Sequence, residues 1–169
     1  MTINNTTAPD FLTYLHEQVP SFLTAIVAEL KSQYNIDVTD LHADHVCYRT
    51  ETTAQYTALV EALQSVDASE SFSLLVESEI GGRQIATFKL SRPIEVGLGS
   101  CRHRIDVVEI PSPKEGSPYE TGLEHIEFVI GDAGIHKSPI NDEVHAAALD
   151  AWMGKYPSIS WNTKAFHKQ

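Results

Sequence analysis

Carboxylate and imidazole side chains stand among apolar residues in the segment 104–130. Two runs of alternating apolar and polar residues indicate two strands there, joined by a loop rich in proline and glycine. The period of two places His125 and Glu127 on the same face of the second strand, together with Leu123. In the first strand, the same period places Ile105, Val107 and Glu109 on one face. The opposite face of the second strand is mainly apolar and carries Glu124, Ile126, Phe128 and Ile130. Imidazoles and carboxylates on the inside of a sheet need a reason beyond packing.

A short strand with similar chemistry is predicted at residues 44–49. Its alternation puts three polar or reactive side chains on one face, namely His45, Cys47 and Arg49. Arg49 and Glu127 each lie two residues along a strand from a histidine, so both are candidates for contacting a substrate or orienting a ligand. Arg49 could instead pair with Glu127 or Glu109 and hold the sheet together without catalysis.

The composition of the chain excludes several classes of protein. Its 169 residues are 42% hydrophobic, enough for one sizeable core, and its formal net charge is −11. Nucleic-acid and anionic-membrane binding are disfavoured because phosphate contacts need clustered cations. The opening residues do not resemble a leader peptide, and no apolar run reaches the length of a membrane span, so a cytoplasmic protein is expected. Cys47 and Cys101 are expected to be free thiols, and cations beside Cys101 would lower its pKa.

Helical patterning precedes the first predicted strand. Apolar residues recur at helical spacing over residues 11–36, after a polar segment at 1–8 that is expected to be frayed. Pro20 divides this region, and Ser21 suits the first turn of a new helix. Two amphipathic helices are therefore predicted rather than one.

The predicted order then continues through a helix and three strands. A threonine can cap a helix over about residues 52–66, and the glycine pair 81–82 separates two alternating runs, as a type I′ hairpin turn requires. Residues 91–103 are expected to be a looser segment before the strand that carries Glu109.

The same order begins again with the strand of His125. A helix is predicted from about Asn141 to Met153, after a loop, and the start of a strand is predicted within residues 158–166. The second unit is expected to be incomplete at its C-terminal end, either because the chain is a piece of a longer one or because the unit is shortened. An open sheet edge would offer a surface for a homodimer.

The segments ADHVCYR, GGRQIATFKL, VVEIPSPKEG and GLEHIEFVI resemble those of the YecM-like branch of the vicinal-oxygen-chelate superfamily. The resemblance runs from the N-terminal helices to about Ser160. It implies an α+β fold in which paired βαβββ modules form a cupped mixed sheet around a divalent metal. The implied division is a helical segment at 1–40 and a domain at 41–169, with modules at about 41–115 and 120–169.

The superfamily pattern takes metal ligands from the first and last strands of one module and the first strand of the next, and His45, Glu109 and His125 match these positions. The residue types agree, because two neutral imidazoles and a carboxylate suit zinc, manganese, iron(II) or nickel and leave positions open for substrate. A fourth ligand, a carboxylate on the last strand of the second module, has no obvious source in this chain. Hydrogen-bonded polar groups in a core are the alternative explanation.

The resemblance implies a metal-dependent isomerase, lyase or oxygenase that acts on a small oxygen-bearing metabolite, with Glu127 and Arg49 as candidate catalytic residues. The alternative is a non-catalytic binding or interaction protein that keeps the cupped fold. Nucleotide cofactors and serine-hydrolase chemistry are not supported, because the motifs GxxxxGK[ST] and G-x-S-x-G do not occur. The sequence identifies neither the substrate nor the metal.

Overall fold

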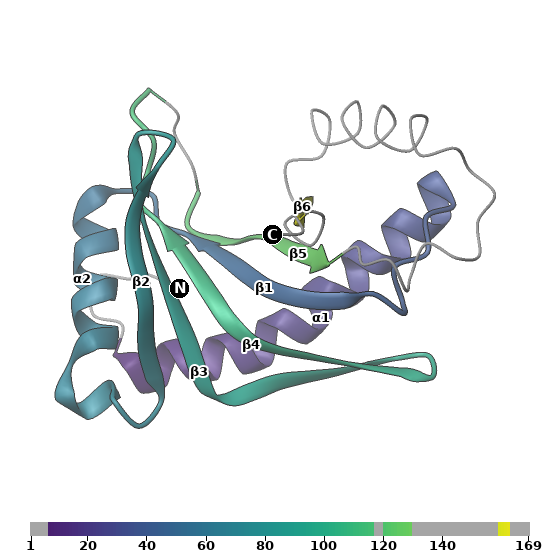
Figure 1. The fold of residues 1–169 in the computed structure, drawn as a ribbon, viewed down its shortest axis with the longest axis horizontal. Helices are drawn as coiled ribbons and strands as arrows, with labels where there is room; N and C mark the ends of the chain where they lie inside the picture. Colours follow the sequence, from purple (N-terminus) through teal and green to yellow (C-terminus); the bar gives the residue numbers. More distant parts are fainter. Residues whose placement is uncertain (1–6, 117–119, 130–158, 163–169) are drawn as a thin grey trace, which may run out of the picture.

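Two helices pack on one face of a curled, mixed sheet in the computed structural model, which describes residues 7–116, 120–129 and 159–162 (Figure 1). The elements are α1 (Ala8–Tyr34), β1 (His42–Arg49), α2 (Thr53–Gln64), the single 3-10 turn η2 (Val66–Ala68), β2 (Phe72–Ile80), β3 (Arg83–Leu98), β4 (Cys101–Pro111), β5 (Gly122–Val129) and β6 (Ile159–Asn162). The six strands lie in the order β2-β3-β4-β1-β5-β6. The predicted α+β class is confirmed.

A single helix, α1, replaces the two helices predicted near the N-terminus. Thr7 caps it in a reciprocal pair with Asp10, so the helix begins inside the segment expected to be frayed and then continues through Pro20. An interior proline costs about 3 kcal/mol, because it removes a hydrogen bond and crowds the preceding turn. The buried stripe nevertheless runs past this position through Val19 and Leu23, both fully buried. Burying each such side chain contributes about 1.5–3 kcal/mol, so packing outweighs the proline and the predicted break was wrong.

The order β1-α2-β2-β3-β4 confirms the predicted βαβββ module. Thr52 caps α2 in a second reciprocal pair, with Gln55. The β2–β3 hairpin turns at Gly81 and Gly82, whose φ angles are 60° and 78°. Two successive positive φ angles are what a type I′ turn requires, and glycine adopts them without strain.

Strands β3 and β4 are longer than predicted. Residues 91–103 were expected to be loose. They instead form the end of β3, a tight turn and the start of β4, and these two strands pair with each other. The pairing shifts register between Lys89 and Ile94, and Pro93 in this interval cannot donate to a regular ladder. Irregular pairing disrupts the alternation by which a strand is recognised, which is why sequence reasoning missed this part. Ile105 was predicted to share a face with Glu109. This prediction was wrong, because Ile105 is fully buried in the hydrophobic core.

Strand β1 occupies the middle of the sheet. It runs parallel to β4 and antiparallel to β5, and β6 runs parallel to β5. Side chains from one face of the sheet join α1 and α2 in one hydrophobic core. The opposite face, called the site face below, carries the predicted ligands.

Part of the second module lies outside the described residues. This holds for the helix predicted at about 141–153 and for the loop before it. The strand predicted within 158–166 is confirmed where β6 is described.

Candidate metal centre

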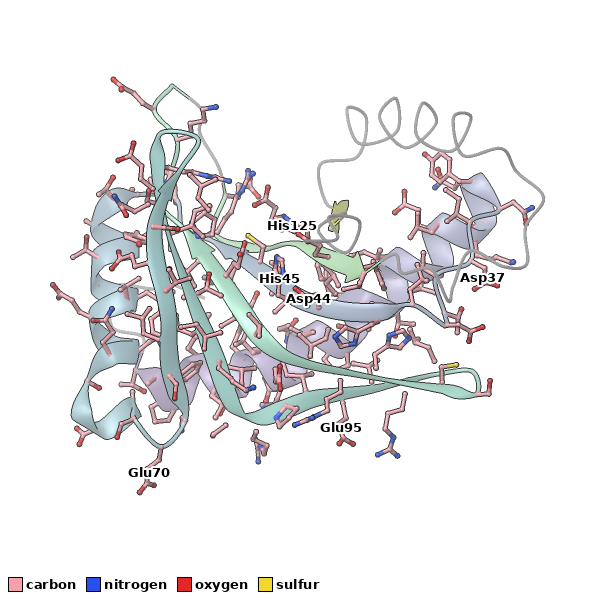
Figure 2. The ribbon with its side chains drawn as sticks, viewed as in Figure 1. Asp37, Asp44, His45, Glu70, Glu95 and His125 are labelled. Carbon is pink, nitrogen blue, oxygen red and sulfur yellow. The ribbon has the colours of Figure 1, made fainter. Side chains whose placement is uncertain are left out.

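The central strands bring the predicted ligands to one region of the site face. Core residues alternate along β1 with His45, Cys47 and Arg49, as predicted. Cys47 is the register partner of Glu109 on β4 and of His125 on β5. Figure 2 shows the two histidines close to each other on neighbouring strands. The structure therefore places all three predicted ligands on adjacent strands.

Two β-bulges bring further carboxylates to this region. The pairing of β1 with β5 skips Asp44 on one strand and Glu124 on the other, and each of these residues directly precedes a histidine. A bulge breaks strict alternation and re-aims a side chain. Glu124 accordingly contacts Cys47, whereas Leu123 packs against the core. The predicted faces of Leu123 and Glu124 were therefore wrong, and the bulge is the reason.

The β1–β5 pair has an internal two-fold relation. Adding 80 to the number of a β1 residue gives a counterpart in β5. Each pair of register partners then maps onto another pair, except Val46 and Ile126, which map onto each other. The relation matches three pairs of polar side chains: His45 with His125, Asp44 with Glu124, and Cys47 with Glu127. The sequences ADHV and LEHI already share an acidic residue, a histidine and a branched aliphatic residue. Asp44 and Glu124 were not predicted as site residues, and this repeat is the signal in the sequence by which they could have been found.

His45 has carboxylates near both of its ring nitrogens. Nδ1 lies 3.0 Å from Asp44 Oδ2, while Nε2 lies 3.4 Å from Glu109 Oε2 and 3.5 Å from Glu127 Oε2. Burial disfavours charge on the ring, but the three carboxylates outweigh it and raise the pKa of His45 to about 9. Nε2 is buried and forms no hydrogen bond with any described residue. A buried nitrogen that faces two carboxylates is well placed to bind a cation.

His125 faces His45, with the two ring centroids 6.1 Å apart. Burial, and then the charge of His45, lower the pKa of His125 to about 4. Its Nδ1 lies 3.6 Å from Glu124 Oε2, which mirrors the position of Asp44 beside His45. Because its pKa is about 4, the ring of His125 is neutral at physiological pH, and neutral imidazole is the form that binds metals.

Arg49 forms an ion pair with Glu124, a partner that sequence reasoning did not suggest. The guanidinium holds Oε1, and Oε2 of the same carboxylate accepts a hydrogen bond from the Cys47 thiol at 3.5 Å. Burial, and then the charge of Glu109, raise the pKa of Cys47 to about 12. Cys47 therefore keeps its proton unless a bound cation displaces it.

Among the described residues, two groups of three side chains place their donor atoms within 4.8 Å of one another. The groups are Asp44, His45 and Glu127, and Cys47, Glu124 and His125. Glu109 lies 3.4 Å from His45 Nε2 but belongs to neither group, so no group among the described residues contains His45, Glu109 and His125 together. Imidazole nitrogen, carboxylate oxygen and thiolate sulfur are ligands of zinc and related ions. The donor set fits a divalent metal, and each group contains one predicted histidine.

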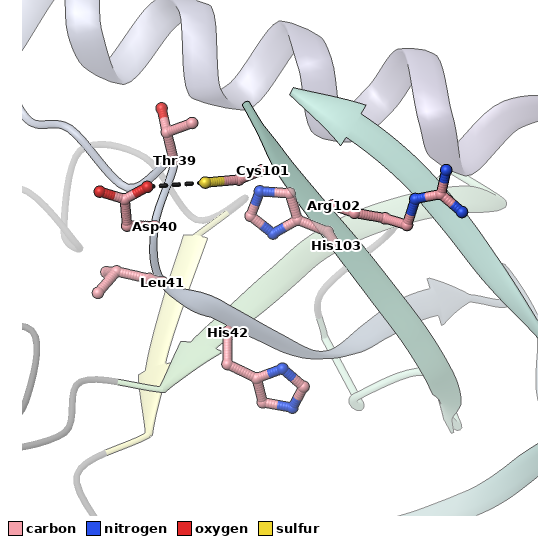
Figure 3. Close-up of a pocket in the computed structure, with 7 residues that line it drawn as sticks. All are labelled: Thr39, Asp40, Leu41, His42, Cys101, Arg102 and His103. Atoms are coloured by element: carbon pink, nitrogen blue, oxygen red, sulfur yellow. Dashed lines mark hydrogen bonds between the residues drawn. The ribbon is translucent and has the colours of Figure 1, made fainter. Parts of the chain in front are cut away.

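A separate hollow of about 350 Å³ lies between the segment that enters β1 and the start of β4 (Figure 3). The residues that line it, 39–42 and 101–103, include none of the predicted ligands. The Cys101 thiol there donates a hydrogen bond to Asp40 at 2.8 Å, and this carboxylate raises the pKa of the thiol. The expectation that neighbouring cations lower this pKa was therefore wrong.

The fold and the site define an α+β protein with a curled, open mixed sheet and groups of possible metal ligands on the face opposite its helices. No helix in the described ranges is long and apolar enough to cross a membrane.

A profile of the YecM protein family matches residues 12–149, so the chain belongs to this family. The chain is 31% identical over 124 residues to Protein YecM of Escherichia coli K12, and the alignment covers 72% of this chain. The chain spans 59% of the length of that curated relative.

A search of solved structures matches two chains. A structural-genomics target named Protein EC4020 is 29% identical, with a TM-score of 0.57, over 83% of this chain and 68% of the other. A hypothetical protein from Bacillus halodurans is 16% identical, with a TM-score of 0.35, over 66% and 68% of the two chains. The similarity to Protein EC4020 supports a related fold.

Proposed function

We propose that this protein binds a divalent metal ion on the site face and acts with it on a small oxygen-bearing metabolite. The proposed ligands are His45, Glu109 and His125, and Glu127 lies 3.5 Å from Nε2 of the same His45 ring. One observation carries the proposal. Nε2 of His45 is buried without a hydrogen bond to any described residue, and two carboxylates approach it at 3.4 and 3.5 Å.

Taken one at a time, each of these two separations suits a pair of ligands that bind the same ion. Two ligand atoms that each lie about 2.1 Å from a tetrahedral ion are about 3.4 Å apart. A typical N–H···O hydrogen bond is shorter, at about 2.9 Å. A cation at Nε2 would also offset the repulsion among Asp44, Glu109 and Glu127, which are drawn together around one ring. Zinc, manganese, iron(II) and nickel all accept this ligand set.

The arrangement of strands supports kinship with the vicinal-oxygen-chelate superfamily. A complete βαβββ module precedes β5 and β6, and the parallel pair β5–β6 mirrors the parallel pair β1–β4. The superfamily pattern takes a fourth ligand from the last strand of the second module. Here the register position that mirrors Glu109 is Ser160, which is not a carboxylate. A three-ligand site leaves positions for substrate oxygens or water.

The residues around the site have distinct roles in this proposal. A bound divalent ion would polarise a carbonyl or enolate oxygen of the substrate. Glu127, on the site face beside His45, is the candidate proton acceptor. Arg49 acts as a positioning residue, because its guanidinium holds the carboxylate of Glu124. The resemblance to the superfamily implies isomerisation, lyase chemistry or oxygenation as the reaction.

Metal analysis of the full chain, purified without a chelator, tests this site. The wild-type chain is expected to retain metal at near stoichiometry, and His45→Ala and His125→Ala are each expected to lose the equivalent bound there. His16→Ala is the matched control, because His16 lies on α1, on the opposite side of the sheet. Metal content that is unchanged in both site variants would show that the ligand assignment is wrong.

A further inference from the structure

We infer that Cys47, Glu124 and His125 form a second cation site, separate from the one at His45, that takes a thiophilic divalent ion such as zinc. These side chains place one donor atom each within 4.8 Å of one another. They are also the two-fold images of the other donor group, Glu127, Asp44 and His45. The site is therefore one half of a duplicated arrangement, in which cysteine takes the place of a glutamate.

The separations between the donor atoms match those of zinc ligands. Cys47 Sγ lies 3.5 Å from Glu124 Oε2, and His125 Nδ1 lies 3.6 Å from the same oxygen. Zinc bonds of about 2.3 Å to sulfur and 2.1 Å to oxygen or nitrogen, at tetrahedral angles, put such atoms about 3.6 and 3.4 Å apart. Two of the three separations therefore already fit a zinc ion, and the third, between the donor atoms of Cys47 and His125, is within 4.8 Å.

The Glu124 carboxylate is already oriented for this role. Arg49 holds its Oε1, which leaves Oε2 directed at both Cys47 and His125. Partners of this kind fix the orientation of a ligand and tune its affinity for metal. The side chain of Glu124 is 11% exposed and that of His125 15%, so little water competes for the ion.

The two sites differ in chemical character. The group around His45 offers only nitrogen and oxygen, whereas the second group adds the sulfur of Cys47. Thiolate ligands favour zinc and other soft ions over magnesium, calcium or manganese. The second site uses Nδ1 of His125, so the other ring nitrogen remains available to the His45 site. Binding of the ion would release the thiol proton of Cys47 to solvent.

Cobalt(II) is the probe for this site, because a cobalt–thiolate bond gives a charge-transfer band in the near ultraviolet. Titration of the full chain with cobalt(II) is expected to produce a saturable band. Cys47→Ser should remove the band, and the matched variant Cys101→Ser should keep it. Glu124→Gln should weaken cobalt binding about 10- to 100-fold. It also tests the site independently of Cys47, should serine at that position prevent folding.

Each outcome decides the proposal. The absence of a band in the wild-type chain would overturn it, and so would a band that survives Cys47→Ser but disappears in Cys101→Ser. Undiminished affinity in Glu124→Gln would overturn it as well. His45→Ala separates the two sites. The band should persist in that variant even though the metal at His45 is lost, and its disappearance would show that there is a single centre.

Discussion

His45 and His125 are counterparts in the two-fold relation, yet their ionisation differs widely. The pKa of His45 is raised to about 9, and that of His125 is lowered to about 4. Burial disfavours charge on both rings. The carboxylates of Asp44, Glu109 and Glu127 outweigh it only at His45, and the charge on His45 then acts against protonation of His125. At neutral pH the metal-free pair therefore carries its proton on His45.

Metal affinity at His45 should rise steeply with pH, because the ion must displace this proton. A pKa of about 9 predicts an increase of about 90-fold between pH 6 and pH 8. An ordinary histidine, with a pKa of about 6.5, would give only about four-fold. Calorimetric titration with manganese(II), which has little affinity for thiolates, measures this site.

The variant Asp44→Asn is the control for this pH dependence. It removes one of the carboxylates that raise the pKa of His45. The increase in affinity between pH 6 and pH 8 should therefore become smaller in the variant. A wild-type increase near four-fold would contradict the charged state assigned to His45.

At the scale of the elements, the bulges make a prediction about deletions. Removing Asp44 should leave the fold intact, because this residue has no register partner on β5. The expected cost is about 1–3 kcal/mol, since the buried Nδ1 of His45 loses its partner. Removing Val46 instead shifts every following side chain of β1 to the other face and turns Tyr48 out of the core. That deletion should cost more than about 4 kcal/mol. Similar melting temperatures for the two deletions would contradict the register.

Sequence periodicity predicted most of the elements but not their irregularities. The hairpin at Gly81 and Gly82 was predictable because the glycine pair has a specific turn geometry. The faces of Asp44 and Glu124 depend on bulges, which arise from pairing with another strand and leave no period in their own segment. The ligand pattern was recognisable from the histidines, whereas the neighbouring carboxylates required the three-dimensional register.

Pro20 is the position where tertiary packing overrides local preference in α1. Pro20→Ala should stabilise the protein by about 1–3 kcal/mol, because the helix regains a hydrogen bond. Melting temperature should rise by about 2–4 °C for each kcal/mol. Pro93→Ala is the matched control. Pro93 lies where the β3–β4 register shifts, so alanine there should change stability by less than about 1 kcal/mol. Equal effects of both substitutions would contradict this account.

At the scale of the whole molecule, one core connects the N-terminal helix with the strands that carry the site. Helix α1 contributes eight buried side chains: Ala8, Phe11, Leu15, Val19, Leu23, Ile26, Val27 and Leu30. They belong to the same cluster as the core residues of β1, β4 and β5. Phe11 packs edge-on against Tyr48, with ring centroids 4.9 Å apart, directly beside Cys47 and Arg49 in β1. The helix therefore helps to hold the central strand in place.

Removal of residues 1–40 should abolish cooperative folding rather than release an independent domain. The larger side chains of α1 each contribute about 1.5–3 kcal/mol on burial, and their sum matches or exceeds the about 5–15 kcal/mol stability of a typical domain. Circular dichroism of residues 41–169 should show no cooperative melting transition. Leu15→Ala in the full chain is the comparison. It should cost about 2–5 kcal/mol and keep a cooperative transition, because one cavity weakens the core without removing it. A fragment that melts as sharply as the full chain would show that α1 is an appendage and that the strands alone form the core around the site.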